Sequence, residues 1–125
     1  DSLEKIVIPG SVKSIGRWAF YSCSSLTSVV IPNGVTTIAN SAFAWCTNMQ
    51  SVEIPNSITS IEYEAFYNCS SLEFIVIPNS VAFVGSQAFS SCGNLRIACM
   101  ASSKPSLWSK YWNYSNCPVV WGYKG

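Results

Sequence analysis

Cysteine is the residue type in this chain that could most readily take part in chemistry, and its spacing is regular. Four of the six cysteines recur at a fixed interval of 23 residues: Cys23, Cys46, Cys69 and Cys92. A zinc site typically shows close pairs such as C-x₂-C instead. We therefore interpret this row as small buried thiols that face the interior, with disulfides between repeats or a row of metal ligands as the alternatives.

Cys99 and Cys117 lie outside this interval, in the C-terminal part of the chain. In an exported protein they would be candidates for one disulfide that closes the 18-residue span between them. In the loop-entropy model such a crosslink contributes about 3 kcal/mol. The alternative is a pair of free thiols in a packed terminal section, and the sequence leaves both possibilities open.

Other catalytic groups are scarce. The chain has no histidine, which removes the commonest general base and the Ser-His and Cys-His nucleophile pairs. Glu62 and Glu64 are two residues apart and are interpreted as solvated side chains rather than as an acid–base pair. The sequence has no glycine-rich phosphate-binding loop. It therefore predicts a protein that is not an enzyme and that needs no cofactor and no metal.

Composition narrows the possible partners. The chain has 125 residues, a length typical of one domain, with 49% hydrophobic and only 10% charged residues. A net charge of +1 gives no general attraction to nucleic acid or to anionic lipid. The longest apolar runs are far shorter than the ~20 residues that span a bilayer. We expect no nucleic-acid partner and no insertion of this segment into a membrane.

A 23-residue pattern, LxxIxIPxxVxxIxxxAFxxC, recurs four times without a gap. The structure of this repeat must position the four regularly spaced cysteines. Alternating apolar residues, as in Ile6–Ile8, predict a strand. Pro9 ends that strand because proline has no N–H to donate. Val12 and Ile15 then return the chain toward the interior. The Ala-Phe pair that follows, residues 19–20 in the first copy, is predicted on a short helical or 3₁₀ turn.

The four copies are expected to fold only as a stack, because one copy buries too little apolar surface to offset the ordering of 23 residues. Strands of successive copies should then lie parallel, about 4.8 Å apart. Equivalent residues would lie above one another. The clearest such column should be that of Phe20, Phe43, Phe66 and Phe89.

Residues 95–125 depart from the pattern and are rich in tryptophan and tyrosine. We predict that they form the last strand and an aromatic C-terminal cap over the open apolar end of the stack. The same aromatic residues would also suit a carbohydrate-binding platform, although packing is the preferred interpretation. Residues 1–94 are predicted to be four repeats of an N-terminally truncated array. The two parts together should form a single structural domain.

The repeat closely resembles the BspA-like leucine-rich repeats of bacterial surface antigens, and the matching positions run from Leu3 to about Leu95. The resemblance implies an α/β fold. This would be a right-handed leucine-rich-repeat solenoid with one parallel β-sheet, short 3₁₀ or helical turns on its convex side and an aromatic C-terminal cap. It also implies an extracellular location at the cell surface and a role in protein binding or adhesion. The partner would be a protein ligand, such as host extracellular matrix or another cell surface.

In such a solenoid, the strand residues between the inward positions would face outward on the concave sheet. They differ from copy to copy, whereas the inward positions do not. The candidate ligand-binding residues are Lys5, Val7, Ser28, Val30, Ser51, Glu53, Phe74 and Val76. The four apolar members, exposed together, would make a patch of the size that often marks a partner site. The alternative function is a structural spacer, a rod that presents another domain and binds nothing itself.

Overall fold

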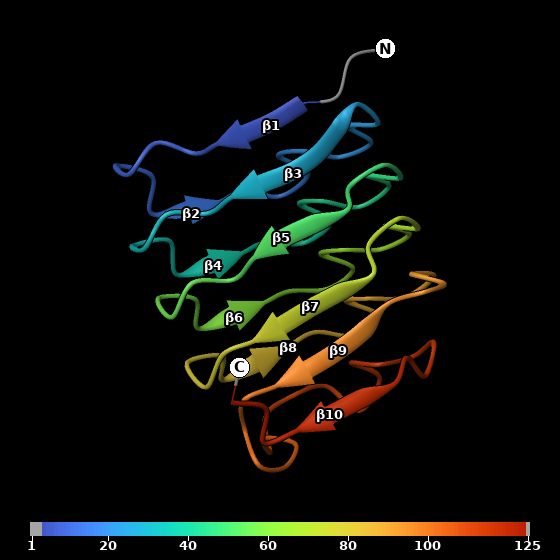
Figure 1. The fold of residues 1–125 in the computed structure, drawn as a ribbon. Helices are drawn as coiled ribbons and strands as arrows, with labels where there is room; N and C mark the ends of the chain where they lie inside the picture. The colour runs from blue at the N-terminus through green and yellow to red at the C-terminus, as the bar shows by residue number, and fades with distance from the viewer. Residues whose placement is uncertain (1–3, 125) are drawn as a thin grey trace.

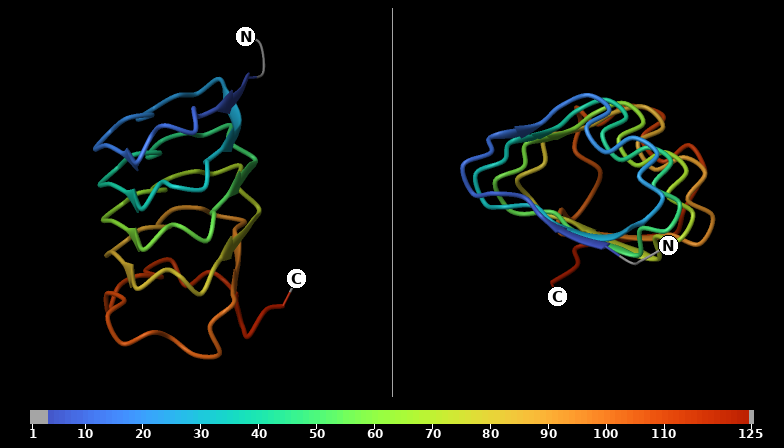
Figure 2. Two further views of the ribbon diagram at one scale, coloured as in Figure 1. Left: turned by 90° about the vertical axis from the view of Figure 1, so that its left-hand side faces the viewer. Right: turned by 90° about the horizontal axis from the view of Figure 1, so that it is seen from above.

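The computed structural model describes residues 4–124, which form a stack of coils with one 23-residue repeat per coil (Figure 1). We number the coils from the N-terminus: residues 4–25, 26–48, 49–71 and 72–94, followed by a further turn formed by the C-terminal residues. Figure 2 shows the coils one above another from the side, and nearly superposed when viewed down the stack. The solenoid predicted from the repeat is confirmed.

One side of the stack, here called the long-strand face, carries a strand from every coil. The strands are β1 (Glu4–Val7), β3 (Leu26–Val30), β5 (Ser51–Glu53), β7 (Phe74–Ile77), β9 (Arg96–Cys99) and β10 (Val119–Trp121). Parallel pairing joins β1, β3 and β5 in one sheet and β7, β9 and β10 in another. The strand ladder is therefore interrupted between β5 and β7.

A second set of parallel strands lines another side of each coil. It contains β2 (Ser14–Ile15), β4 (Thr37–Ile38), β6 (Ser60–Ile61) and β8 (Phe83–Val84), which pair in this order as one continuous sheet. The prediction of a single sheet therefore requires correction. The apolar residue that returns the chain to the core lies in an extended segment, and an extended segment stacked on its equivalents forms ladder hydrogen bonds.

The third side of each coil is here called the turn wall. It consists of residues 16–23 and their equivalents 39–46, 62–69 and 85–92. Within the part of the chain that the structure describes, this wall contains no helix. The helical turn expected around the Ala-Phe pair is therefore not confirmed. In the first coil the N–H groups of Trp18, Phe20 and Ser22 donate to carbonyl groups of the second coil at 3.1, 2.7 and 2.8 Å. The residues between them donate to carbonyls three residues back. In a helix all of these N–H groups would donate to carbonyls of the same helix, whereas here every second one donates to a carbonyl of the neighbouring coil.

Two positions per coil in the turn wall have a left-handed backbone. They are Trp18 and Ser22, Ser41 and Trp45, Glu64 and Asn68, and Gln87 and Ser91, with φ between 54° and 64°. L-residues other than Gly, Asn and Asp rarely adopt this conformation, because Cβ then crowds the following carbonyl. The stacked hydrogen bonds hold the chain in this conformation in every coil.

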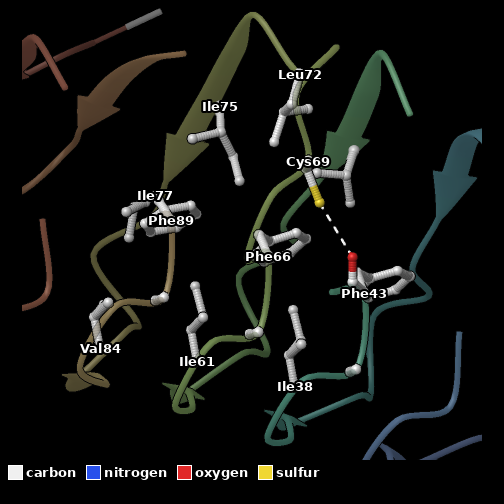
Figure 3. Packing of buried hydrophobic residues seen from close by; sticks show 14 of the residues in the cluster. Ile38, Phe43, Ile61, Phe66, Cys69, Leu72, Ile75, Ile77, Val84 and Phe89 are labelled. Atoms are coloured by element: carbon white, nitrogen blue, oxygen red, sulfur yellow. Dashed lines mark hydrogen bonds between the residues drawn. The ribbon is translucent and has the colours of Figure 1, made fainter. Parts of the chain in front are cut away.

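The predicted phenylalanine column runs through the core and is confirmed. The rings of Phe20, Phe43, Phe66 and Phe89 stack with centroids 5.1, 5.3 and 5.5 Å apart and planes within 4° of parallel. Figure 3 shows three rings of the column, Phe43, Phe66 and Phe89, between apolar residues of the short strands and of the long strands. Equivalent side chains therefore lie above one another from coil to coil.

The C-terminal residues complete the stack and then return across it. Trp108 and Trp112 are buried, with ring centroids 4.8 Å apart, and Trp121 lies 5.9 Å from each. The indole N–H of Trp108 donates to the carbonyl of Val81 at 3.2 Å. The N–H of Tyr123 donates to the carbonyl of Cys99 at 2.9 Å, so after β10 the chain passes beside the end of β9 (Figure 1).

Candidate functional site

The predicted binding residues lie along the long-strand face in two rows set by the strand register. Lys5, Ser28 and Ser51 form the first row. Val7, Val30 and Glu53 form the second. Beyond the interruption, Phe74 and Val76 lie opposite Arg96 and Ala98 of β9.

A hollow of about 450 Å³ lies at the interruption between β5 and β7. Four of the eight predicted residues line it: Ser51, Glu53, Phe74 and Val76. Where two strands are not paired, their facing backbone groups have no ladder partner across the gap. The repeat pattern therefore identified the side chains around this hollow, but it contained no sign of the interrupted ladder that opens it.

Phe74 lies between two side chains that the repeat pattern did not single out. The guanidinium carbon of Arg96 is 5.9 Å from the centroid of the Phe74 ring, within the range of a cation–π contact. The Tyr123 ring is 5.9 Å away in an edge-on arrangement. Phe74 nevertheless remains 41% exposed. The strand register would have identified Arg96, but the return of the C-terminal residues that brings Tyr123 to this place lies outside the repeat.

The apolar patch expected on this face is divided. Val7 is 65% exposed and lies beside Val30, which is 36% exposed. Glu53 follows Val30 in the same row, so a carboxylate separates these valines from Phe74 and Val76. Val76 is only partly exposed. The face thus offers one aliphatic pair near the N-terminal end and one aromatic site at the hollow.

The structure does not bring Cys99 and Cys117 together. Val119 pairs with Ile97 and Trp121 with Cys99, so Cys117 precedes the level of Cys99 by four residues. Four residues of strand correspond to about 13 Å, whereas a disulfide requires Cα atoms within about 7 Å. Instead, Cys117 follows Cys92 in the cysteine row: its thiol lies 3.9 Å from the Cys92 carbonyl.

The cysteine row faces the core, as the sequence predicted. The thiols of Cys46, Cys69 and Cys92 each donate to the carbonyl of the phenylalanine 26 residues earlier, at 3.1 Å; Figure 3 draws the bond of Cys69. Within residues 4–124, no three His, Cys, Asp or Glu side chains are grouped so that they could hold a metal ion. The row is a packing feature with one weak hydrogen bond per coil.

Burial is the leading influence on the pKa of two core thiols, Cys46 in the row and Cys99 outside it. It raises the pKa of Cys46 from an ordinary value of 9.0 to about 11, and the pKa of Cys99 to about 12. Desolvation is the leading cause in both, since a thiolate is unfavourable in an apolar interior. At neutral pH both groups stay protonated, and a protonated thiol is a poor nucleophile.

We therefore expect the stability of the fold to decrease as the pH rises from about 9 toward 11. In this range the unfolded chain releases the Cys46 proton while the folded chain keeps it, so the folded state binds more protons and loses stability with rising pH. Urea unfolding midpoints at pH 7, 9 and 10.5 would measure this decrease. The Cys46→Ala variant should show a shallower decrease than the parent chain, and an equal decrease in both would contradict the assignment to this thiol.

No helix within residues 4–124 has the length and apolar character required to cross a bilayer. The part of the chain that the structure describes consists instead of short strands and turns.

Comparison with known proteins identifies the relatives of this fold. The profile described as "BspA type Leucine rich repeat region (6 copies)" matches residues 1–118, which extends beyond the four repeats found in the sequence. No curated protein matches the chain. The leucine-rich repeat protein TpLRR of T. pallidum is 30% identical, with a TM-score of 0.73 over 94% of this chain and 52% of that one.

Two further solved structures are similar. A leucine-rich cell surface protein of Faecalibacterium prausnitzii is 33% identical, with a TM-score of 0.65 over 83% of this chain and 35% of that one. The pneumococcal vaccine antigen PcpA is 22% identical and has a TM-score of 0.79 over 97% of this chain and 29% of that one. At this identity PcpA supports the fold alone. The chain spans about half of TpLRR and about a third or less of the other two proteins.

Proposed function

This chain belongs to the BspA-type leucine-rich repeat family, and we propose that it is an extracellular, cell-surface module that binds a protein through its long-strand face. The binding centre would be the hollow between β5 and β7. The ligand would be a protein of the host extracellular matrix or of another cell surface. The similarity to a leucine-rich cell surface protein of F. prausnitzii supports the location.

The strongest support for a binding role comes from the surroundings of Phe74. Phe74 is an aromatic ring that stays 41% exposed between an arginine and a tyrosine. Aromatic residues and arginine are enriched in protein interfaces, and Trp, Tyr and Arg most of all at their energetic centres. Glu53 also lines the hollow and adds a negative charge to it. We expect the ligand to insert an apolar side chain beside Phe74 and to present a basic group to Glu53.

The continuous stack also supports a second candidate function, that of a structural spacer. The turn wall and the phenylalanine column connect all four coils without interruption, and such a rod would hold an attached domain at a fixed distance. The two functions differ in one prediction. A spacer would keep its function when the exposed residues at the hollow are substituted, whereas a binding module would lose it.

We also assign the aromatic C-terminal residues the role of a cap. Trp108, Trp112 and Trp121 contact one another at the end of the stack. Ser109 and Trp108 supply hydrogen bonds to the carbonyls of Val84 and Val81 in the fourth coil. Terminal units with these properties protect the open end of a repeat array from solvent and from association with other chains.

The Phe74→Ser/Val76→Ser double variant tests the binding role. Purified fibronectin, fibrinogen, laminin and collagen would be immobilised, and binding of the parent chain and the variant would be measured as a function of concentration. We expect the parent to bind at least one of them and the variant to lose at least about tenfold in affinity, as is usual for residues at an interface centre.

The matched control is Leu107→Ser, which changes an exposed apolar residue outside the strands of the long-strand face. This control should bind as the parent does. Equal binding by the parent and the Phe74→Ser/Val76→Ser variant would refute the hollow as the binding centre. An absence of binding to all four matrix proteins at about 10 μM would favour the spacer.

A further inference from the structure

A notch interrupts the turn wall on a different side of the molecule from the long-strand face. Its volume is about 530 Å³. It arises because the second coil has small residues where its neighbours have large ones. Ser41 lies between Trp18 and Glu64 in the stacked order, and Ala44 lies between Tyr21 and Tyr67.

The notch thus has a floor from the second coil and walls from the coils on either side. Ser41 and Ala44 are buried at its base. Trp18 and Tyr21 of the first coil lie on one side, and Tyr63 and Glu64 of the third coil lie on the other. Coils are spaced at 5.1 and 5.3 Å in the adjoining phenylalanine column. The small side chains of Ser41 and Ala44 therefore leave room for about one flat ring.

The two tryptophans of the notch stay exposed, although the Trp45 ring contacts the Tyr67 ring edge-on at 6.0 Å. Trp18 is 64% exposed and Trp45 is 43% exposed, and both have a left-handed backbone, with φ of 58° and 64°. This conformation disfavours bulky residues and would be better served by glycine or asparagine. Two exposed tryptophans at unfavourable positions beside one notch indicate a function other than stability.

Polar groups surround the rings. Arg17 and Glu64 contribute opposite charges that sum to zero, and Asn40 adds an amide with both donors and an acceptor. The neighbouring Glu64 carboxylate raises the pKa of the Tyr63 hydroxyl, since it favours the protonated phenol. The rim therefore offers donors and acceptors in several directions without a net charge.

We propose that this notch is a carbohydrate-binding site that takes one ring of a neutral glycan. A pyranose has an apolar face of C–H groups suited to contact with Trp18 or Trp45, and an equatorial edge of hydroxyl groups that both donate and accept hydrogen bonds. The mixed rim of Arg17, Asn40 and Glu64 matches such an edge. A charged sugar or a charged peptide would leave one of the two rim charges opposed to it.

Glycan binding can be measured through the tryptophan side chains of the protein. It has five tryptophans, each with one indole N–H signal in a proton–nitrogen NMR spectrum. The probes are the methyl glycosides of glucose, galactose, mannose, fucose, N-acetylglucosamine and N-acetylgalactosamine. We expect at least one of them to shift the signals of Trp18 and Trp45 saturably, with an affinity of about 1 mM or tighter. The signals of the buried Trp108 and Trp112 should not move.

The decisive variant is Ala44→Tyr, which gives the second coil the residue that the first and third coils carry at this position. The backbone accepts tyrosine there in both neighbours, so we expect the variant to fold. It should fill the notch and weaken binding by roughly tenfold or more. Ala44→Ser keeps the notch open and should bind as the parent does. Trp18→Ala should weaken binding without unfolding the chain.

Two results would overturn the proposal: no glycoside shifts both exposed indole signals, or the shifts persist undiminished in Ala44→Tyr. The site is independent of the long-strand face. The Phe74→Ser/Val76→Ser variant should therefore retain glycoside binding, and a failure of matrix binding would leave this test unaffected.

Discussion

Replacing Phe66 by alanine is expected to lower the free energy of unfolding by about 4 kcal/mol, a large share of the stability of a domain of this size. Phe66 is fully buried and has a stacked ring on both sides, Phe43 at 5.3 Å and Phe89 at 5.5 Å. Removal of its ring leaves a cavity in the middle of the column. The coils cannot close this cavity, because the hydrogen bonds of the continuous short-strand set and of the turn wall fix their spacing.

Equilibrium unfolding in urea, followed by circular dichroism, would measure this loss. Phe20→Ala provides the matched control, since Phe20 is only partly buried and stacks on one ring alone. Its expected loss is about half that of Phe66→Ala. If the two substitutions destabilised the chain equally, stability would not depend on continuity of the column.

Replacing Trp108 by alanine should destabilise the chain by about 3 kcal/mol. The substitution removes a buried indole, its contacts with Trp112 and Trp121, and the hydrogen bond to the Val81 carbonyl. That carbonyl would then remain in an apolar environment without this donor, which adds to the loss. We expect the damage to begin in the fourth coil, because the aromatic residues contact it directly.

Hydrogen exchange would locate this effect. In Trp108→Ala the amides of residues 72–94 should exchange faster than in the parent chain, while those of the second coil should change least. Trp18→Ala makes the same substitution at an exposed position and should leave the unfolding free energy within about 0.5 kcal/mol of the parent. Uniform acceleration in all coils would indicate that the stack unfolds as one unit and that the aromatic residues are not a local cap.

The repeat predicts the parts of the fold that depend on equivalent residues lying above one another. Its columns predicted the strands of the long-strand face, the phenylalanine column and the inward cysteine row. It did not predict the second strand set or the left-handed turns. Both arise from hydrogen bonds between coils, and these depend on backbone position rather than on side-chain type. Trp18 and Trp45 are examples: tryptophan rarely adopts a left-handed conformation, so the residue type would have predicted a different backbone at both positions.

The candidate site was predictable to a similar extent. Alternation along the strands identified Ser51, Glu53, Phe74 and Val76 as outward-facing residues. The hollow among them depends on the missing ladder between β5 and β7. Tyr123 reaches Phe74 because the chain passes beside the end of β9 after β10. Neither feature follows from a pattern of 23 residues. The notch in the turn wall differs in this respect: a small residue between two large ones in a column is visible once the copies are aligned.

The hydrogen bonds of the turn wall also have an electrostatic consequence. Asn40, Ala42 and Ala44 accept from the coil before them. Every backbone hydrogen bond between turn-wall residues of neighbouring coils points the same way, from an N–H toward the following coil. Peptide dipoles aligned in this way add up, as they do along an α-helix. The wall should therefore have a partial negative charge at its N-terminal end, at the carbonyls of Arg17, Ala19 and Tyr21, and a partial positive charge near Gln87 and Ser91. A short array of this kind would attract cations to one end and anions to the other, although its side chains carry almost no net charge.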